Sequence, residues 1–349
     1  KRKNKWEITQ LAISPDGNKI AYSTNELGKY FIWIYDLGTN KYTKVLKRGY
    51  KIDRKEDKSF PLIDWHPNGK VLAFIEEREG AVFFNFYDTD SKKKTKLQVQ
   101  KIDKITSFKY NHSGTQFVFS GVQNGKTDLF LYTILGNGYL KLTDDFYDEI
   151  HPSFIENSTK VIFSSNRKSD SLYSKVDKSP NNQSFDVFIY DLTNKFQRRL
   201  KRVTNTPEIN EEYPFELKPR EYTYLANKNG VRNRYIAIFD STISAVDTAI
   251  TYRYFSKTSA LTNYKRNATL LDVNTSTKQI GMLVYNEGSY QIFKGNASAD
   301  RMIANELLPS DFKNQDEDFW KNKKESSVEI ISVSPVISDN NKIKTITIF

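Results

Sequence analysis

Short runs of hydrophobic residues, separated by polar turns, cover most of this chain. The runs are rich in β-branched and aromatic residues, as in residues 30–37 and 82–88, and turn signals recur about every 8 to 12 residues. Side chains of these types suit half-buried, pleated surfaces. The pattern therefore predicts short β-strands joined by tight turns.

The same order of turn and strands recurs six times along the sequence. In the first unit, Ser14-Pro15-Asp16-Gly17 precedes apolar runs at 19–23 and 30–37. Pro presets φ and Gly tolerates positive φ, so this turn joins two antiparallel strands closely. Later units begin near Trp65, Tyr110, Pro152, Tyr213 and Thr269. The spacing of about 45 to 60 residues is in the range of propeller blades.

A four-stranded sheet of this size cannot bury both of its faces alone, whereas sheets packed radially cover one another. The repeats therefore predict an all-β fold, a six-bladed β-propeller of four-stranded antiparallel blades, with strands ordered from the inner to the outer edge. A β-sandwich with coincidental turns is the alternative, and six recurrences in one strand order argue against it.

We expect residues 1–300 to form the propeller and residues 301–349 to form a C-terminal extension. The sixth unit lacks an evident outer strand after Phe293. The extension has two strand-like stretches, 328–333 and 342–349, so it either closes the last blade or begins a following module.

The repeat resembles the TolB-like propeller repeat, a relative of the WD40 blade. The segments that carry the resemblance are Ser14-Pro15-Asp16-Gly17, Leu142-Thr143-Asp144-Asp145, Pro152-Ser153-Phe154 and Ser164-Ser165-Asn166-Arg167. It extends from about residue 6 to about residue 295. The resemblance implies a bacterial cell-envelope setting, in the periplasm or associated with the outer membrane. It also implies a non-catalytic scaffold that binds protein partners of the envelope, within a larger assembly or as a module of one.

Charge and composition exclude several other classes. The net charge is +11, but the basic residues form short, scattered clusters, whereas a nucleic-acid partner would require them on one face. The chain has no cysteine, which excludes thiol catalysis, thiolate metal sites and disulfides. No apolar run approaches the roughly 20 residues of a membrane-spanning helix.

No familiar catalytic motif is present: there is no Gly-x-Ser-x-Gly elbow, Walker loop, His-Glu-x-x-His or calcium loop. His66 and His112 fall beside hairpin turns, and His151 precedes an inner strand close to the mouth of the channel. We therefore predict no catalytic residue, no metal ligand and no cofactor.

Three aspartates, Asp36, Asp88 and Asp191, each follow a Tyr at the end of a third strand. We expect them to accept backbone N–H groups in the next turn. The alternative function is an enzyme or binder that acts on carbohydrate or peptide through a metal or polar site in the central channel. Convergent His and carboxylate side chains there would favour that alternative, and a neutral lining would favour the scaffold.

Long connections mark the predicted binding face. In a propeller, the loops between second and third strands and the loops between blades lie on one face. The long connections here, 47–60, 166–185 and 201–213, are of these two kinds. Insertions collected on one face often mark a binding surface, although surface loops also lengthen without function. The candidate partner-binding residues are Arg48, Tyr50, Arg54, Arg167, Tyr173, Asn181, Asn182, Glu208 and Glu211.

Overall fold

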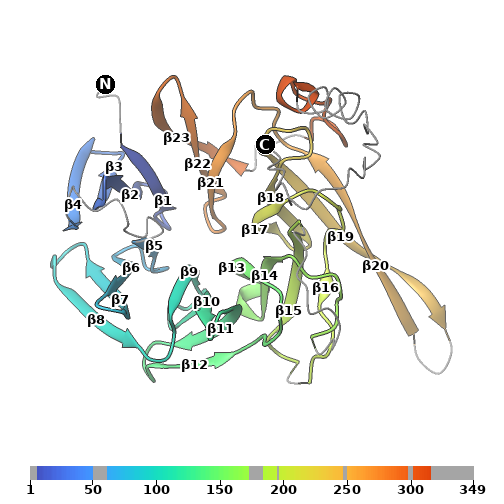
Figure 1. The fold of residues 1–349 in the computed structure, drawn as a ribbon, viewed down its shortest axis with the longest axis horizontal. Helices are drawn as coiled ribbons and strands as arrows, with labels where there is room; N and C mark the ends of the chain where they lie inside the picture. The colour runs from blue at the N-terminus through green and yellow to red at the C-terminus, as the bar shows by residue number, and fades with distance from the viewer. Residues whose placement is uncertain are drawn as a thin grey trace, which may run out of the picture.

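Six antiparallel sheets surround a central axis, and each is built from strands that are consecutive in the chain (Figure 1). The structure is a computed structural model that describes residues 6–49, 61–172, 184–194, 196–246, 250–297 and 302–315. The predicted six-bladed propeller is confirmed, as is the order of strands from the inner to the outer edge.

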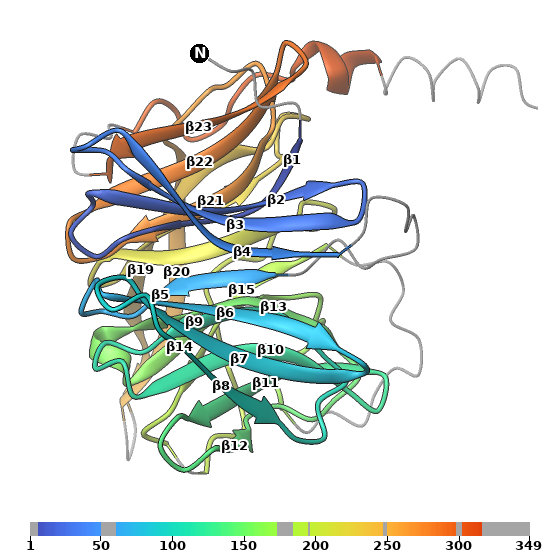
Figure 2. The ribbon, with the colours of Figure 1, turned by 90° about the vertical axis from the view of Figure 1, so that its left-hand side faces the viewer.

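The first three blades are four-stranded. Blade 1 contains β1 (Glu7–Ile13), β2 (Lys19–Glu26), β3 (Lys29–Asp36) and β4 (Lys41–Arg48). Blade 2 contains β5 (Leu62–Trp65), β6 (Val71–Arg78), β7 (Ala81–Asp88) and β8 (Lys94–Val99). Blade 3 contains β9 (Lys104–Tyr110), β10 (Gln116–Gln123), β11 (Lys126–Thr133) and β12 (Gly138–Lys141). Figure 2 shows these three sheets from the side, following one another around the ring.

The remaining blades are less regular. Blade 4 contains β13 (Glu149–Ile155), a 3₁₀ turn η1 (Glu156–Ser158), β14 (Lys160–Ser165), β15 (Asp186–Asp191) and the two-residue β16 (Lys201–Arg202). Blade 5 contains β17 (Glu211–Lys218), β18 (Glu221–Ala226), β19 (Asn233–Val246) and β20 (Ile250–Ala260). Blade 6 contains β21 (Ala268–Asn274), β22 (Gln279–Asn286) and β23 (Ser289–Asn296).

The turns between first and second strands have the predicted conformation. Gly17, Gly69 and Gly114 have φ of 71°, 71° and 75°, which glycine adopts without a steric penalty. The aspartates at the ends of third strands also act as predicted. Asp36 accepts the N–H of Thr39 at 2.8 Å, and Asp88 and Asp191 accept N–H groups in their own turns.

The hydrophobic core lies between neighbouring sheets and not within any one of them. Phe84 of blade 2 stacks on Phe117 of blade 3 with ring centroids 4.6 Å apart, and both side chains are fully buried. Similar clusters join blade 1 to blade 2, blade 3 to blade 4, blade 4 to blade 5, and blade 5 to blade 6. Each blade therefore depends on its neighbours to bury its faces.

The ring closes where blade 6 meets blade 1. Ile13 donates its N–H to Asp272 Oδ2 at 2.7 Å, and Asn274 Nδ2 donates to the carbonyl of Ser14 at 2.7 Å. Within the described residues blade 6 has three strands, as expected from the missing outer strand. The segments 328–333 and 342–349 lie outside the described residues, so their role remains a prediction.

The described part of the extension lies against blade 5. Ala304 forms a β-bridge with Ala260, and Ser310 donates its N–H to the carbonyl of Asn229 at 2.9 Å. A single helical turn follows at residues 311–315. No helix in the described part of the chain is long and apolar enough to cross a membrane.

Candidate functional site

A charged group occupies the central channel. Lys109 of β9 places its Nζ 2.9 Å from Asp64 Oδ1 of β5 and 2.6 Å from Asp272 Oδ1 of β21. Burial raises the pKa of Asp64, and Lys109 opposes this effect. Burial acts to lower the pKa of Lys109, but the two carboxylates reverse this and raise it. The ammonium therefore neutralises the two carboxylates. It lies between them, in the position that a metal ion bound by both would occupy.

The second oxygen of each carboxylate is also bound. Asp64 Oδ2 accepts the N–H of Tyr110 at 2.9 Å, and Asp272 Oδ2 accepts that of Ile13. Among the described residues, no group of three or more His, Cys, Asp or Glu could hold a metal ion.

His151 and Tyr213 meet deeper in the channel. They lie at bulges of β13 and β17, with φ of 52° and 55°, and their rings stack with centroids 3.7 Å apart. Burial, with Arg232 nearby, lowers the pKa of His151 to about 3. His151 is therefore a neutral channel residue within an inner strand, and the prediction that it precedes this strand is wrong. His66 and His112 lie at turns, as predicted.

The space beside these rings is small. A cavity of about 100 Å³ is lined by residues of all six innermost strands, including His151, Tyr213 and Lys109. Pockets for drug-sized ligands measure roughly 300–1,000 Å³. The lining of the channel is therefore not the neutral one expected of a scaffold, but its two carboxylates are already paired with Lys109.

A wider depression of about 540 Å³ forms one mouth of the channel, lined by residues of all six blades. Lys109, Asp64 and Asp272 line its floor together with turn residues such as Asn157 and Ser276. Sequence patterns did not identify this triad, because each member is a single polar residue in an otherwise ordinary inner strand.

Two candidate binding residues are buried instead of exposed, which corrects their assignment. Arg167 Nη2 lies 2.5 Å from Glu149 Oε1 and 3.0 Å from Asp145 Oδ2, and its side chain is fully buried. Burial raises the pKa of Glu149 to about 8, and Arg167 opposes this increase. Glu211 is also fully buried and accepts a hydrogen bond from Thr206 Oγ1 at 3.1 Å.

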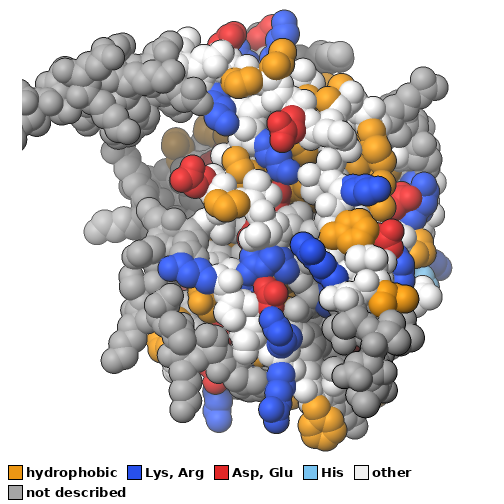
Figure 3. Space-filling model, turned by 90° about the vertical axis from the view of Figure 1, so that its right-hand side faces the viewer, with side chains coloured by type: hydrophobic (Ala, Val, Ile, Leu, Met, Phe, Trp, Pro, Cys, Tyr) orange, Lys and Arg blue, Asp and Glu red, His pale blue; other side chains and the backbone are white. Residues whose placement is uncertain are grey.

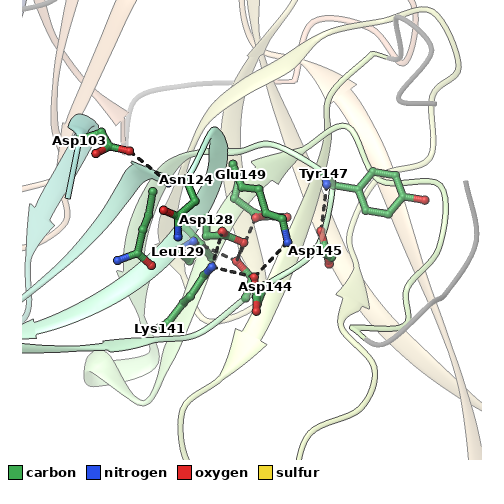
Figure 4. A network of polar contacts seen from close by, with 12 residues as sticks. Asp103, Asn124, Asp128, Leu129, Lys141, Asp144, Asp145, Tyr147 and Glu149 are labelled. Carbon is green, nitrogen blue, oxygen red and sulfur yellow. Dashed lines mark hydrogen bonds and ion pairs between the residues drawn. The ribbon is translucent and has the colours of Figure 1, made fainter. Parts of the chain in front are cut away.

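The network around Glu149 joins blade 3 to blade 4 (Figure 4). Thr143 Oγ1 donates to Glu149 Oε2 at 2.9 Å, and Lys141 pairs with Asp128 at 2.9 Å and with Asp144 at 2.7 Å. The carboxylates here are satisfied by neighbouring side chains, so the network stabilises the contact between blades.

Two of the remaining candidate binding residues lie at the surface, and the other five lie outside the described residues. Arg48 ends β4, half-exposed, with Nε 3.4 Å from Glu76 Oε1, and Glu208 is exposed. The candidates outside the described residues are Tyr50, Arg54, Tyr173, Asn181 and Asn182.

Two of the long connections do come together at the outer rim. Leu200 donates its N–H to the carbonyl of Asp170 at 2.7 Å, and Arg202 binds Asp170 at 2.8 Å. These residues belong to the connections 166–185 and 201–213, or lie directly beside them. Figure 3 shows Lys and Arg side chains gathered on this side of the molecule.

The rim is hollowed because two adjacent outer strands differ in length. β16 has two residues, whereas the neighbouring β20 has 11 and runs with β19 beyond the ring (Figure 1). A cavity of about 770 Å³ fills the difference. We call it the rim groove, and its lining residues are Asp170, residues 199–206, Tyr254, Phe255, Ser256 and Thr258.

Two cations of the rim groove have no carboxylate within ion-pair distance in the described residues, although one of them, Lys201, interacts electrostatically with Asp191. Lys201 Nζ lies 4.7 Å from the centroid of the Tyr254 ring, and neither Lys201 nor Arg199 forms an ion pair within the described part of the chain. Arg202, in contrast, is neutralised by Asp170 and Asp186. A second cavity of about 520 Å³ begins on the other side of the Lys201–Tyr254 contact.

Comparison with known proteins identifies the fold alone. No protein-family model and no curated protein matches the sequence. TolB from Acinetobacter baumannii matches with a TM-score of 0.50 at 18% identity over 66% of this chain, which spans about half (51%) of that TolB chain. The β-propeller domain of the Trilobed protease from Pyrococcus furiosus, described as having an open velcro topology, gives 0.51 at 12% identity, covering 90% of this chain and 98% of that one.

The structure of an enzyme is similar to this chain to about the same degree. Oligogalacturonate lyase in complex with manganese matches with a TM-score of 0.51 at 14% identity, covering 86% of this chain and 77% of that chain. Since these structures share the propeller and differ in activity, the likeness indicates the architecture and leaves function to the site.

Proposed function

We propose that this chain is a non-catalytic propeller scaffold that binds a protein partner of the bacterial cell envelope through the rim groove. The observation that carries this proposal is that Arg199 and Lys201 form no ion pair within the described residues and lie beside exposed aromatic side chains in an open groove. The envelope setting rests on the resemblance of the repeat to TolB-like blades.

The composition of the rim groove supports a protein partner. Tyr254 is 44% exposed and Phe255 37%, on a hairpin that extends outward from the ring. Aromatic residues and arginine are enriched in protein interfaces and supply most of their binding energy. Part of the groove, Asp170 and residues 201–206, also comes from two of the connections in which the sequence predicts a binding surface, although none of the candidate binding residues within the described part of the chain lines it.

The same composition argues against catalysis in the groove. Its one acidic residue, Asp170, is paired with Arg202, and no histidine occurs among the described residues that line it. A general base within reach of a substrate is therefore not provided by these side chains.

The second candidate function is binding of, or action on, carbohydrate or peptide at the channel. The observation that favours it is the backbone conformation of His151 and Tyr213, because non-glycine residues at positive φ cost about 1–3 kcal/mol each and are concentrated at functional sites. The paired carboxylates and the narrow cavity weigh against it.

Site-specific photo-crosslinking in cells tests the proposal. A photoreactive phenylalanine analogue at Phe255 should form a specific crosslinked product with an envelope protein. The same analogue at Tyr285, which is 51% exposed on blade 6, should not. The double variant Arg199→Glu/Lys201→Glu should reduce the Phe255 product at least tenfold, and excess purified chain should compete for it.

The matched charge control is Lys93→Glu, an exposed turn residue of blade 2. Absence of a product at Phe255, or a product insensitive to the groove variants and to competition, would contradict the proposal. A product obtained only from positions at the channel mouth would favour the second candidate.

A further inference from the structure

We propose that the partner binds through an extended, acidic segment that pairs with the free edge of β20 and places carboxylates against Arg199 and Lys201. This inference rests on the proposed function and identifies the kind of partner segment that the rim groove accepts.

The edge of β20 is open beside the groove. Ala260 donates its N–H to the carbonyl of Ala304 at 2.7 Å and accepts the N–H of Ile303 at 2.8 Å. Backbone groups along an antiparallel strand alternate in direction, so those of Thr258, Ser256 and Tyr254 point the same way as those of Ala260. In the described part of the chain, no strand pairs with these three residues on that side.

The groove continues onto this edge. Tyr254, Ser256 and Thr258 share one face of β20, whereas Phe255 belongs to the other face by alternation, yet all four line the cavity. The cavity therefore extends around the edge of the strand. Ser256 Oγ is buried there without a hydrogen-bond partner among the described residues.

An extended segment fits this combination of features. A row of unpaired N–H and C=O groups is a template for a further strand, and side-chain pockets beside it give specificity. The chain already places its own residues 303 and 304 at the end of this edge. The three outward-facing residues would pair with a segment of about five residues.

The charges on the groove indicate the composition of that segment. Arg199 and Lys201 form no ion pair within the described residues, although Lys201 interacts electrostatically with Asp191, and the chain carries a net charge of +11. Arg253 and Lys257, exposed on β20, add positive charge at the same edge. Like charges on facing edges would repel a second copy of this chain, so an acidic partner is favoured over self-pairing.

The experiment uses defined peptides and the full chain. The probe is a fluorescent eight-residue peptide of alternating Glu and Val, and its controls are a Lys–Val peptide and a fully N-methylated Glu–Val peptide, which keeps the charge but cannot donate backbone hydrogen bonds. We expect saturable binding of the Glu–Val peptide that weakens with added salt, and at least tenfold weaker binding of both controls.

Variants locate the binding site. Arg199→Glu and Lys201→Glu should each weaken binding of the Glu–Val peptide at least fivefold, and Lys93→Glu should not. Ser256→Pro should abolish binding because it removes an outward N–H at an edge position where proline is tolerated, whereas Ser256→Ala should bind normally. Thermal unfolding of each variant shows whether it folds, and the N-methylated peptide tests strand pairing without altering the protein.

The outcomes separate this inference from the proposed function. If the Glu–Val peptide fails to bind while crosslinking at Phe255 persists, the groove has a partner of another shape and the inference is overturned alone. The inference would also be overturned if the N-methylated peptide bound as tightly as the Glu–Val peptide, or if the Glu–Val peptide bound Ser256→Pro as tightly as wild type, because charge alone would then suffice. Loss of the Phe255 crosslink as well would overturn both.

Discussion

Single residues in the inner strands determine what the channel can do. The bulges at His151 and Tyr213 turn two large side chains toward the axis, where they stack and occupy space that a ligand would need. Neither bulge was predicted, because proline favours an extended residue before it, and the positive φ of His151 and Tyr213 before Pro152 and Pro214 departs from that preference. The turn aspartates, in contrast, were predictable, since their contacts lie within a few residues.

Replacing His151 should change how stability depends on pH. Its pKa is lowered from 6.5 to about 3 in the folded chain, so between these values the unfolded state binds more protons. The free energy of unfolding should therefore rise with pH across this range, by up to about 1.4 kcal/mol per unit. His151→Asn, which tolerates positive φ, should remove this part of the slope in urea unfolding between pH 4.5 and 7.5.

The control for this prediction is His112→Asn, in an exposed turn, which should keep the wild-type slope. A His151→Asn variant with an unchanged slope would show that His151 titrates normally in the folded protein.

At the scale of elements, the sequence predicted the blades well and the outer strands poorly. Inner and middle strands have a buried face, so their apolar positions recur in each unit. The β19–β20 hairpin continues beyond Asp240 and leaves the ring (Figure 1). Ile250, Tyr252 and Tyr254 nevertheless alternate with polar residues as in a blade strand, so alternation alone did not show how far these strands extend. The reduction of β16 to two residues was also missed, and the rim groove arises from these two departures together.

Two matched deletions separate the tip of the hairpin from the groove. Thr242 is opposite Arg253 in a hydrogen-bonded pair, since the alternate residues Tyr254, Ser256 and Thr258 face outward, so replacing residues 243–252 with Asn-Gly should close a two-residue turn and retain the binding residues. Asp240 is opposite Phe255 in another hydrogen-bonded pair, so replacing residues 241–254 in the same way removes Tyr254 together with its outward backbone groups. We expect the first deletion to capture the partner within threefold of wild type and the second at least tenfold less.

Both deletions should retain the far-ultraviolet circular dichroism and cooperative unfolding of the parent, because blade 5 keeps its four strands. Equal loss of capture by the two would place the binding determinant in the tip, outside the rim groove.

At the scale of the whole molecule, stability comes from contacts between blades. Lys109 is the clearest case, since its ammonium joins blade 3 to carboxylates of blades 2 and 6 near the point of ring closure. The sequence predicted the number of blades and their order, which follow from the repeat. It did not predict this triad, because the three residues are far apart in the chain and meet only when the ring closes.

Lys109→Met should destabilise the propeller by about 3–5 kcal/mol, because it leaves two buried carboxylates facing each other without compensation. The triple variant Lys109→Met/Asp64→Asn/Asp272→Asn should recover most of this loss in urea unfolding. A loss below about 1 kcal/mol for Lys109→Met would mean that the channel acids are hydrated and not dependent on the ammonium.

Hydrogen–deuterium exchange of the chain, free and bound to the partner captured at Phe255, tests the rim groove most directly. The outward amides of Tyr254, Ser256 and Thr258 have no backbone partner in the described structure of the free chain, so they should exchange rapidly. Binding should slow exchange at least tenfold in peptides covering 253–259 and also protect 199–206. Protection confined to the channel mouth, around His112 and Asn157, with unchanged exchange in β20, would contradict the account.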